Sequence, residues 1–334
     1  MYIKVNNNRN IREKKMNYII LLVGFFLLIK GADIFVDGAA KIAKKLGIPA
    51  VIVGLTIVSL GTSAPELAIS LISSLQGNNG ITIGNVLGSN IFNTLMVLGV
   101  TAIIMPIVIK KSTIMKDYII NVLVAILLII LTFGSSVFGG EAIITRLNGI
   151  IFLIVCIAYV IYLIISAKNN NETLANESLQ DIKVISCLIK VIIGVTGVII
   201  GGKLVVDSAT NIAYSFGMSE KLVGLTIVAV GTSLPELVTS MVAAIKGEND
   251  IAIGNVLGSN IFNILLILGT SAVINPIPVA INLSIDMIFL IIVSILLGFF
   301  MFTGKNKETK LSKIEGIALV ILYIGYVVYI VMRN

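Results

Sequence analysis

GTSAPEL at residues 61–67 returns as GTSLPEL at 231–237, and IGNVLGSNIFN occurs twice, at 83–93 and at 253–263. Adding 170 to each position from 31 to 99 aligns it with 201–269 without a gap, and 37 of the 69 aligned pairs are identical. A weaker match continues at an offset of 167, between 149–162 and 316–329. The chain is therefore an internal duplication, in which each half is one structural unit.

The composition is that of a membrane protein. Of the 334 residues, 57% are hydrophobic and 12% are charged, and the mean hydropathy is +1.07, whereas soluble domains are about 45–50% apolar and about 25% charged. The apolar residues fall in runs long enough to cross a bilayer. We therefore expect an all-α polytopic membrane protein with ten transmembrane helices, at roughly 17–44, 49–75, 81–105, 118–135, 146–166, 184–214, 219–245, 251–274, 285–302 and 314–332.

The most polar interruption, at 167–183, divides the predicted spans five and five. We expect a first five-helix repeat with an N-terminal arm at 1–166, a connecting loop at 167–183 and a second five-helix repeat at 184–334. Because five is odd, two copies in series cross the bilayer in opposite senses and form an inverted repeat. Inverted repeats around a site near the midplane are typical of secondary transporters, although a duplication can also be neutral history.

The distribution of basic residues predicts the orientation in a cell membrane. Loops on the side of the N-terminus hold eight Lys and Arg, and the opposite loops hold 14. Since the richer side is normally cytoplasmic, both termini are expected outside, although the five basic residues of the N-terminal arm oppose this. The first apolar run follows that arm without a small-residue cleavage site, so it is expected to be a retained span rather than a signal peptide. Basic residues in such loops orient a membrane protein rather than bind nucleic acid.

Glu66 and Glu236 lie well inside predicted spans, where an ionisable side chain costs about 2.5–3.5 kcal/mol and usually has a function. A glycine five residues earlier and a proline directly before each glutamate predict that the helix breaks and restarts there. Such a break is tolerated where it is buried in protein or lines a watery cavity. In the alternative interpretation, the serine three residues before each glutamate forms a capping box with it.

The third and eighth spans carry further polar side chains. Ser89 and Asn93 are four residues apart and share a helical face, and their counterparts are Ser259 and Asn263. The glycines of these spans, spaced four apart, indicate close helix packing. Four more asparagines are expected mainly to form interhelical hydrogen bonds: Asn85, Asn90, Asn255 and Asn260.

The convergent groups are carboxylates, hydroxyls, amide oxygens and carbonyls freed at the helix breaks. The sequence has no His, and Cys156 and Cys187 stand in or beside apolar runs as small buried side chains. Hard oxygen donors suit Ca²⁺ or Na⁺ and argue against Zn²⁺ or Cu, while Mg²⁺ gives up its water too reluctantly. Two carboxylates supply a charge of −2, enough for one Ca²⁺ or two monovalent ions.

With these two motif pairs the chain resembles the sodium/calcium exchangers of the cation/calcium antiporter superfamily, and most closely their compact prokaryotic members. The resemblance implies that the glutamates ligate the ions, that backbone and hydroxyl oxygens assist them, and that the first and sixth spans slide across a core of eight helices. The ligands that it implies are Glu66, Glu236, Thr62, Thr232, Ser63, Ser233, Ser89, Ser259, Asn93, Asn263, and the carbonyls of Ser59 and Ala229. The chain departs from the family at Asn263, where many members carry Asp.

The leading hypothesis is therefore an antiporter that exchanges Na⁺ for Ca²⁺ by alternating access at a midplane site, with no cofactor and with no partner implied besides these ions and the lipid bilayer. A proton-coupled Ca²⁺ or cation antiporter is the first alternative, because a glutamate pair can carry protons. A cation channel is a weaker alternative. A membrane enzyme is the least favoured, since the sequence has no Walker G-x-x-x-x-G-K-[ST], no H-E-x-x-H and no G-x-S-x-G.

Overall fold

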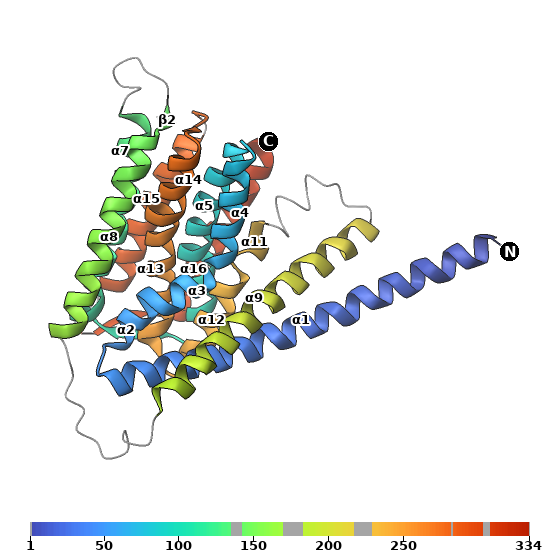
Figure 1. Ribbon diagram of the computed structural model, residues 1–334, viewed down its shortest axis with the longest axis horizontal. Helices are drawn as coiled ribbons and strands as arrows, with labels where there is room; N and C mark the ends of the chain where they lie inside the picture. The colour runs from blue at the N-terminus through green and yellow to red at the C-terminus, as the bar shows by residue number, and fades with distance from the viewer. Residues whose placement is uncertain are drawn as a thin grey trace.

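The computed structural model describes residues 2–134, 142–169, 183–216, 229–281, 283–302 and 308–333. In these ranges the chain is almost entirely helical (Figure 1). Eight of the described helices or helical runs are long and apolar enough to cross a membrane, and two shorter helices that meet at a bend of 50° form a ninth candidate span. The predicted span 219–245 is seen only from residue 229, because residues 219–228 lie outside the described ranges.

The helices of the two halves follow each other in the same order. The first half contains α1 (Tyr2–Leu46), α2 (Ala50–Val53), α3 (Ser59–Thr62), α4 (Ala64–Leu75), α5 (Asn79–Phe92), α6 (Leu98–Ile104), α7 (Lys111–Phe133) and α8 (Arg146–Asn169). The second half contains α9 (Val184–Ser215), α11 (Ala229–Gly231), α12 (Leu234–Ile245), α13 (Asn249–Phe262), α14 (Gly269–Ile274), α15 (Leu283–Phe302) and α16 (Lys313–Arg333). Helix α1 begins well before the predicted boundary at 17, since no Gly or Pro precedes Gly24 to interrupt it.

Both motif helices break where the sequence predicts. Helix α3 ends at Thr62 and α4 begins at Ala64, while α11 ends at Gly231 and α12 begins at Leu234. In each restarted helix the motif proline stands in the first turn, where its missing N–H costs no hydrogen bond. The interrupted helices are thus confirmed.

The sequence did not predict three π-helical segments, at Gly54–Val58, Asn93–Val97 and Asn263–Leu268. The last two begin at the final asparagine of each IGNVLGSNIFN motif, between α5 and α6 and between α13 and α14. Such segments are rare and often occur at functional sites. They occupy equivalent positions in the two repeats, so they belong to the duplicated unit.

Helices α1 and α9 lie side by side and run obliquely to the other helices (Figure 1). Glycines let the two backbones approach closely: a Cβ added at Gly31 would lie 2.6 Å from the backbone nitrogen of Val198, and one at Gly194 would lie 2.5 Å from that of Phe35. Small residues at a crossing are a usual means of helix packing in membranes.

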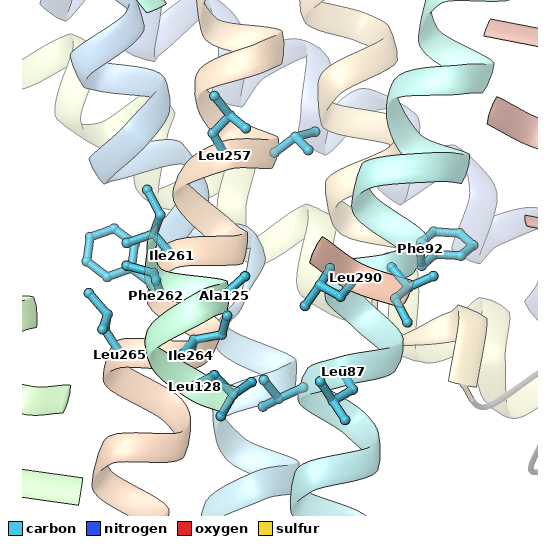
Figure 2. Close-up of a cluster of buried hydrophobic side chains, with 14 of the residues drawn as sticks. Leu87, Phe92, Ala125, Leu128, Leu257, Ile261, Phe262, Ile264, Leu265 and Leu290 are labelled. Carbon is cyan, nitrogen blue, oxygen red and sulfur yellow. The ribbon is translucent and has the colours of Figure 1, made fainter. Parts of the chain in front are cut away.

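The core lies around α13. In the span Asn249–Ile274, 94% of an 18-residue apolar stretch is buried, whereas the corresponding share for α16 is 11%. Helix α16 therefore lies at the periphery. Figure 2 shows Leu257 and Ile261 of α13 in a cluster with Leu87 of α5, Leu128 of α7 and Leu290 of α15. Helix α13 thus lies at the centre of the helices that carry the site described below.

Two short antiparallel sheets join the two halves. Strand β1 (Ile107–Lys110) pairs with β4 (Glu308–Leu311), and β2 (Ile143–Ile144) pairs with β3 (Ile277–Pro278). Helix α7 starts directly after β1, and Figure 1 places β2 beside its other end. The two sheets therefore lie at opposite ends of the molecule, and each takes one strand from each repeat.

Candidate functional site

Glu66 and Glu236 lie in the first turns of the restarted helices α4 and α12, and neither side chain is exposed. In the described part of the chain no lysine or arginine pairs with either carboxylate. A buried charge without a counter-charge is strongly unfavourable. The site thus needs a positive ligand or protons.

The motif serines link the two repeats reciprocally. Ser63 Oγ donates a hydrogen bond to Glu236 Oε1 at 2.9 Å, and Ser233 Oγ donates one to Glu66 Oε1 at 3.0 Å. Neither serine makes a side-chain capping bond in its own helix, so the capping-box interpretation is wrong. Instead, each glutamate is held by the serine of the opposite repeat, which brings both motifs to one site.

The serines of α5 and α13 complete this arrangement. Ser233 Oγ lies 3.1 Å from Ser89 Oγ, and Ser259 Oγ lies 3.4 Å from Glu236 Oε1 and 3.5 Å from the carbonyl oxygen of Ser59. All of these serines are buried. The structure thus brings the four predicted serine hydroxyls and the Ser59 carbonyl next to the glutamates.

Several oxygen atoms at the predicted ligand positions are buried and accept or donate no hydrogen bond within the described residues. They are Glu66 Oε2, Glu236 Oε2, Thr232 Oγ1, Asn93 Oδ1 and Asn263 Oδ1. Buried polar atoms are normally satisfied, and each exception calls for an explanation such as a role in binding an ion. This donor set is one of hard oxygens, which suits Ca²⁺ or Na⁺. No group of three or more His, Cys, Asp or Glu occurs in the described ranges to suit a transition metal.

The remaining predicted residues divide between the site and the helix contacts. Thr62 Oγ1 donates to Asn255 Oδ1 at 3.0 Å, so its hydroxyl bonds an amide of the other repeat. Asn263 Nδ2 donates to Asn90 Oδ1 at 3.0 Å, which leaves only its oxygen for a ligand. Ala229 is the first residue of α11, just before the break; its side chain lies outside what the structure describes.

The interpretation that the other asparagines form interhelical hydrogen bonds is confirmed. Asn90 Nδ2 donates to the carbonyl oxygen of Asn260, and Asn260 Nδ2 donates to Thr94 Oγ1. Asn85 Nδ2 lies 3.0 Å from Ser70 Oγ, and Asn255 Nδ2 lies 2.9 Å from Ser240 Oγ. The two serines were missed in the sequence, although both repeats carry them at the same position of the motif helix.

Comparison with known proteins gives separate evidence on the family. The family model described as sodium/calcium exchanger protein matches residues 16–166 and 187–332, which is most of the chain. This chain belongs to the sodium/calcium exchanger family. As a member of that family it is a multi-pass membrane transporter rather than an enzyme.

Similar proteins support the assignment over nearly the whole exchanger. The sodium/calcium exchanger MaX1 of Methanosarcina acetivorans is 33% identical, covering 94% of this chain and 98% of its own length. The putative antiporter CaxA of Alkalimonas amylolytica is 36% identical, over 92% and 96% of the two chains. A solved structure of the sodium-calcium exchanger NCX_Mj matches with a TM-score of 0.77 at 35% identity, over 92% of this chain and 96% of that one. The fold is therefore that of the compact prokaryotic exchangers.

Proposed function

We propose that this protein exchanges Na⁺ for Ca²⁺ across the cell membrane by alternating access, at a site near the bilayer midplane built around Glu66 and Glu236. The observation that carries the proposal is the reciprocal pair of serine–glutamate bonds between the repeats. It gives two buried carboxylates one common surrounding of neutral oxygens. The related exchangers MaX1 and NCX_Mj are named for the same pair of ions.

Charge and donor number fit this pair of ions. Two ionised carboxylates neutralise one Ca²⁺ or two Na⁺, and exchange requires that either load can occupy the same site. Ca²⁺ takes six to eight oxygen ligands at about 2.3–2.6 Å. The unsatisfied oxygens at Glu66, Glu236, Thr232, Asn93 and Asn263 supply five candidates. The serine hydroxyls and the carbonyls at Ser59 and Ala229 supply the rest.

We further propose that 1–166 and 184–334 are two inverted five-helix repeats joined by the loop 167–183, and that α1 and α9 slide together over the remaining helices. The two sheets support the inversion. The loop after α6 pairs with the loop before α16, and the loop before α8 pairs with the loop after α14, so the pairing exchanges the two halves at opposite ends of the molecule. In this arrangement the access state changes when α1 and α9 shift relative to the site.

Transport in liposomes tests the proposal. Purified protein is reconstituted, and Ca²⁺ uptake is compared between an outward Na⁺ gradient and an outward proton gradient of equal size. We expect uptake with the Na⁺ gradient. Uptake with the proton gradient alone would favour the proton-coupled alternative, and flux at channel rates without any gradient coupling would contradict antiport.

Substitution of the glutamates tests the site itself. Glu66→Gln or Glu236→Gln should abolish Ca²⁺ transport, because one remaining carboxylate cannot balance a divalent ion in a low-dielectric site. Glu315→Gln is the matched control: Glu315 forms a true capping box with Ser312, a role that Gln also fills. Full Ca²⁺ exchange in either site variant would refute the assignment of the glutamates.

A further inference from the structure

Asn85 and Asn255, which the proposed ion site does not use, hold the motif helices in the same way in both repeats. Asn85 Nδ2 contacts Ser70 Oγ at 3.0 Å and the carbonyl oxygen of Glu66 at 3.3 Å. Asn255 Nδ2 contacts Ser240 Oγ at 2.9 Å and the carbonyl oxygen of Glu236 at 3.4 Å. These contacts agree within 0.1 Å, so the two asparagines are placed equivalently beside the two glutamates.

The oxygen atoms of the same two amides differ. Asn255 Oδ1 accepts a hydrogen bond from Thr62 Oγ1 at 3.0 Å. The equivalent bond would join Thr232 to Asn85, but Thr232 Oγ1 is buried and has no hydrogen-bond partner among the described residues. The repeats are identical at all four positions, so the chemistry for both bonds is present and only one bond is made.

An unmade bond of this kind has a measurable cost. A buried hydroxyl without a partner is less stable than a hydrogen-bonded one, and Asn85 offers the residue type that would accept its hydrogen bond. In proteins with inverted repeats, alternating access moves one part of the molecule against the other around the site. When α1 and α9 shift, the symmetry of the repeats implies that the two motif helices exchange their contacts. The bond that is open in one state is then closed in the other.

We propose that Asn85 and Asn255 are positioning residues that accept the motif threonine of the opposite repeat in alternation. Asn255 holds Thr62 in the access state of this structure, and Asn85 holds Thr232 in the opposite state. The inference rests on the proposed alternating access, and it goes beyond it by naming one hydrogen bond that stabilises each state. Each asparagine therefore sets the population of one state while it touches no ion.

Labelling of introduced cysteines measures the two populations. Ser73 of α4 and Ala243 of α12 are repeat-equivalent and buried, and in the inverted repeat they lie on opposite sides of the glutamates. Ser73→Cys and Ala243→Cys are made separately in a background with Cys156→Ala and Cys187→Ala. The rate of modification by an impermeant methanethiosulfonate is measured for each, from its own side of the membrane, in buffer free of Na⁺ and Ca²⁺. The ratio of the two rates reports the access state.

Asn255→Ala should move this ratio about fivefold in one direction and Asn85→Ala about fivefold in the other, as expected for loss of one hydrogen bond. The double variant should return the ratio to within about twofold of the parent, because each state has then lost one bond. General damage to the helices would not be corrected by a second lesion. Shifts in the same direction, no shift, or a double variant that fails to return would overturn the proposal.

A second pair of variants guards against poor folding. Thr62→Val and Thr232→Val remove the donors and leave the contacts of the asparagine nitrogens intact. Thr62→Val should therefore shift the ratio in the same direction as Asn255→Ala, and Thr232→Val in the same direction as Asn85→Ala.

Transport by the wild-type protein distinguishes a failure of this inference from a failure of the proposed ion pair. If Na⁺ fails to drive Ca²⁺ uptake while the ratios shift as expected, the ions are wrong and the alternating bonds stand. If exchange occurs and the ratios do not shift, the bonds are wrong and the exchanger stands.

Discussion

Asn263 stands where the family resemblance leads us to expect Asp, and its surroundings explain how an amide serves there. Its nitrogen donates to Asn90 Oδ1, and its oxygen is buried without a partner. A carboxylate at this position cannot make the first contact, because both facing atoms would be acceptors. The amide is thus matched to Asn90 and leaves one neutral oxygen for an ion.

Substitution of Asn263 should therefore have graded effects. Asn263→Ala should weaken Ca²⁺ exchange without abolishing it, because it removes one neutral oxygen and no charge. Asn263→Asp should keep exchange and add pH dependence: a protonated carboxyl can still donate to Asn90, whereas an ionised one faces Asn90 Oδ1 and two further carboxylates. The rate of exchange as a function of pH, compared with the parent, measures this. An unchanged pH profile would place the residue outside the ion site.

For single residues, the sequence predicted which side chains lie near each other but not which hydrogen bonds they form. The constant offset of 170 between the repeats was enough to predict that Glu66 and Glu236 share one site. The spacing of Ser63 and Glu66 suggested a hydrogen bond within one helix, whereas Ser63 bonds the glutamate of the other repeat. This contact could not be predicted, because local spacing carries no information about contacts between repeats. The partner of Thr62 was missed for the same reason.

Helix breaks, π-helical segments and strand pairing were predictable from the sequence to different degrees. Gly and Pro change the backbone locally, so the breaks before α4 and α12 could be read from single residues. The π-helical segments at Asn93 and Asn263 depend on packing against neighbouring helices, and the two short sheets depend on contacts between residues about 130 to 200 positions apart. Such features have no local signal, and they were missed.

The crossing of α1 and α9 should be sensitive to one methyl group. At Gly31 an added Cβ would meet backbone atoms of α9 at 2.6–2.9 Å, so Gly31→Ala should destabilise the protein by about 1–3 kcal/mol through overpacking. Gly325→Ala is the control, because a Cβ at Gly325 meets nothing within 4 Å, and alanine is the better helix former. Thermal unfolding in detergent compares the two variants. Equal stability would contradict the close crossing.

An ion pair joins the C-terminal end of α16 to a buried carboxylate of α15. Arg333 makes two contacts to Asp286, at 3.1 and 3.0 Å, and Asp286 is 2% exposed. Arg333→Gln should destabilise the protein by about 1.5–3 kcal/mol, because it removes two charge-assisted hydrogen bonds and leaves the buried carboxylate without its counter-charge. The exposed Arg146, at the start of α8, provides the control Arg146→Gln, for which we expect little change. Unfolding temperatures that fall together in both variants would contradict a specific role for the pair.

The orientation of the whole molecule can be tested at the two sheets. The basic loops predict that β1 and β4 face the cytoplasm and that β2 and β3 face outside. Lys310→Cys of β4 should therefore react with an impermeant maleimide only from the cytoplasmic side, and Ile281→Cys, which follows β3 and is 83% exposed, only from outside. The native cysteines are buried and give little background. The reverse pattern would show that the five basic residues of the N-terminal arm decide the orientation.

The strand pairing between the halves also has a consequence for the evolutionary origin of the chain. Neither half contains a strand that pairs with another strand of the same half in the described residues, so one half alone leaves its β-strand edges open. Two copies of one half complete both sheets only if they enter the bilayer in opposite directions. Under the proposed inverted-repeat arrangement, an ancestor of five helices would have worked as a homodimer of dual topology, made from a single gene. Fusion of the two copies would then have allowed each half to diverge from the other, as at Gln76 and Lys246, which are equivalent in position and differ in charge.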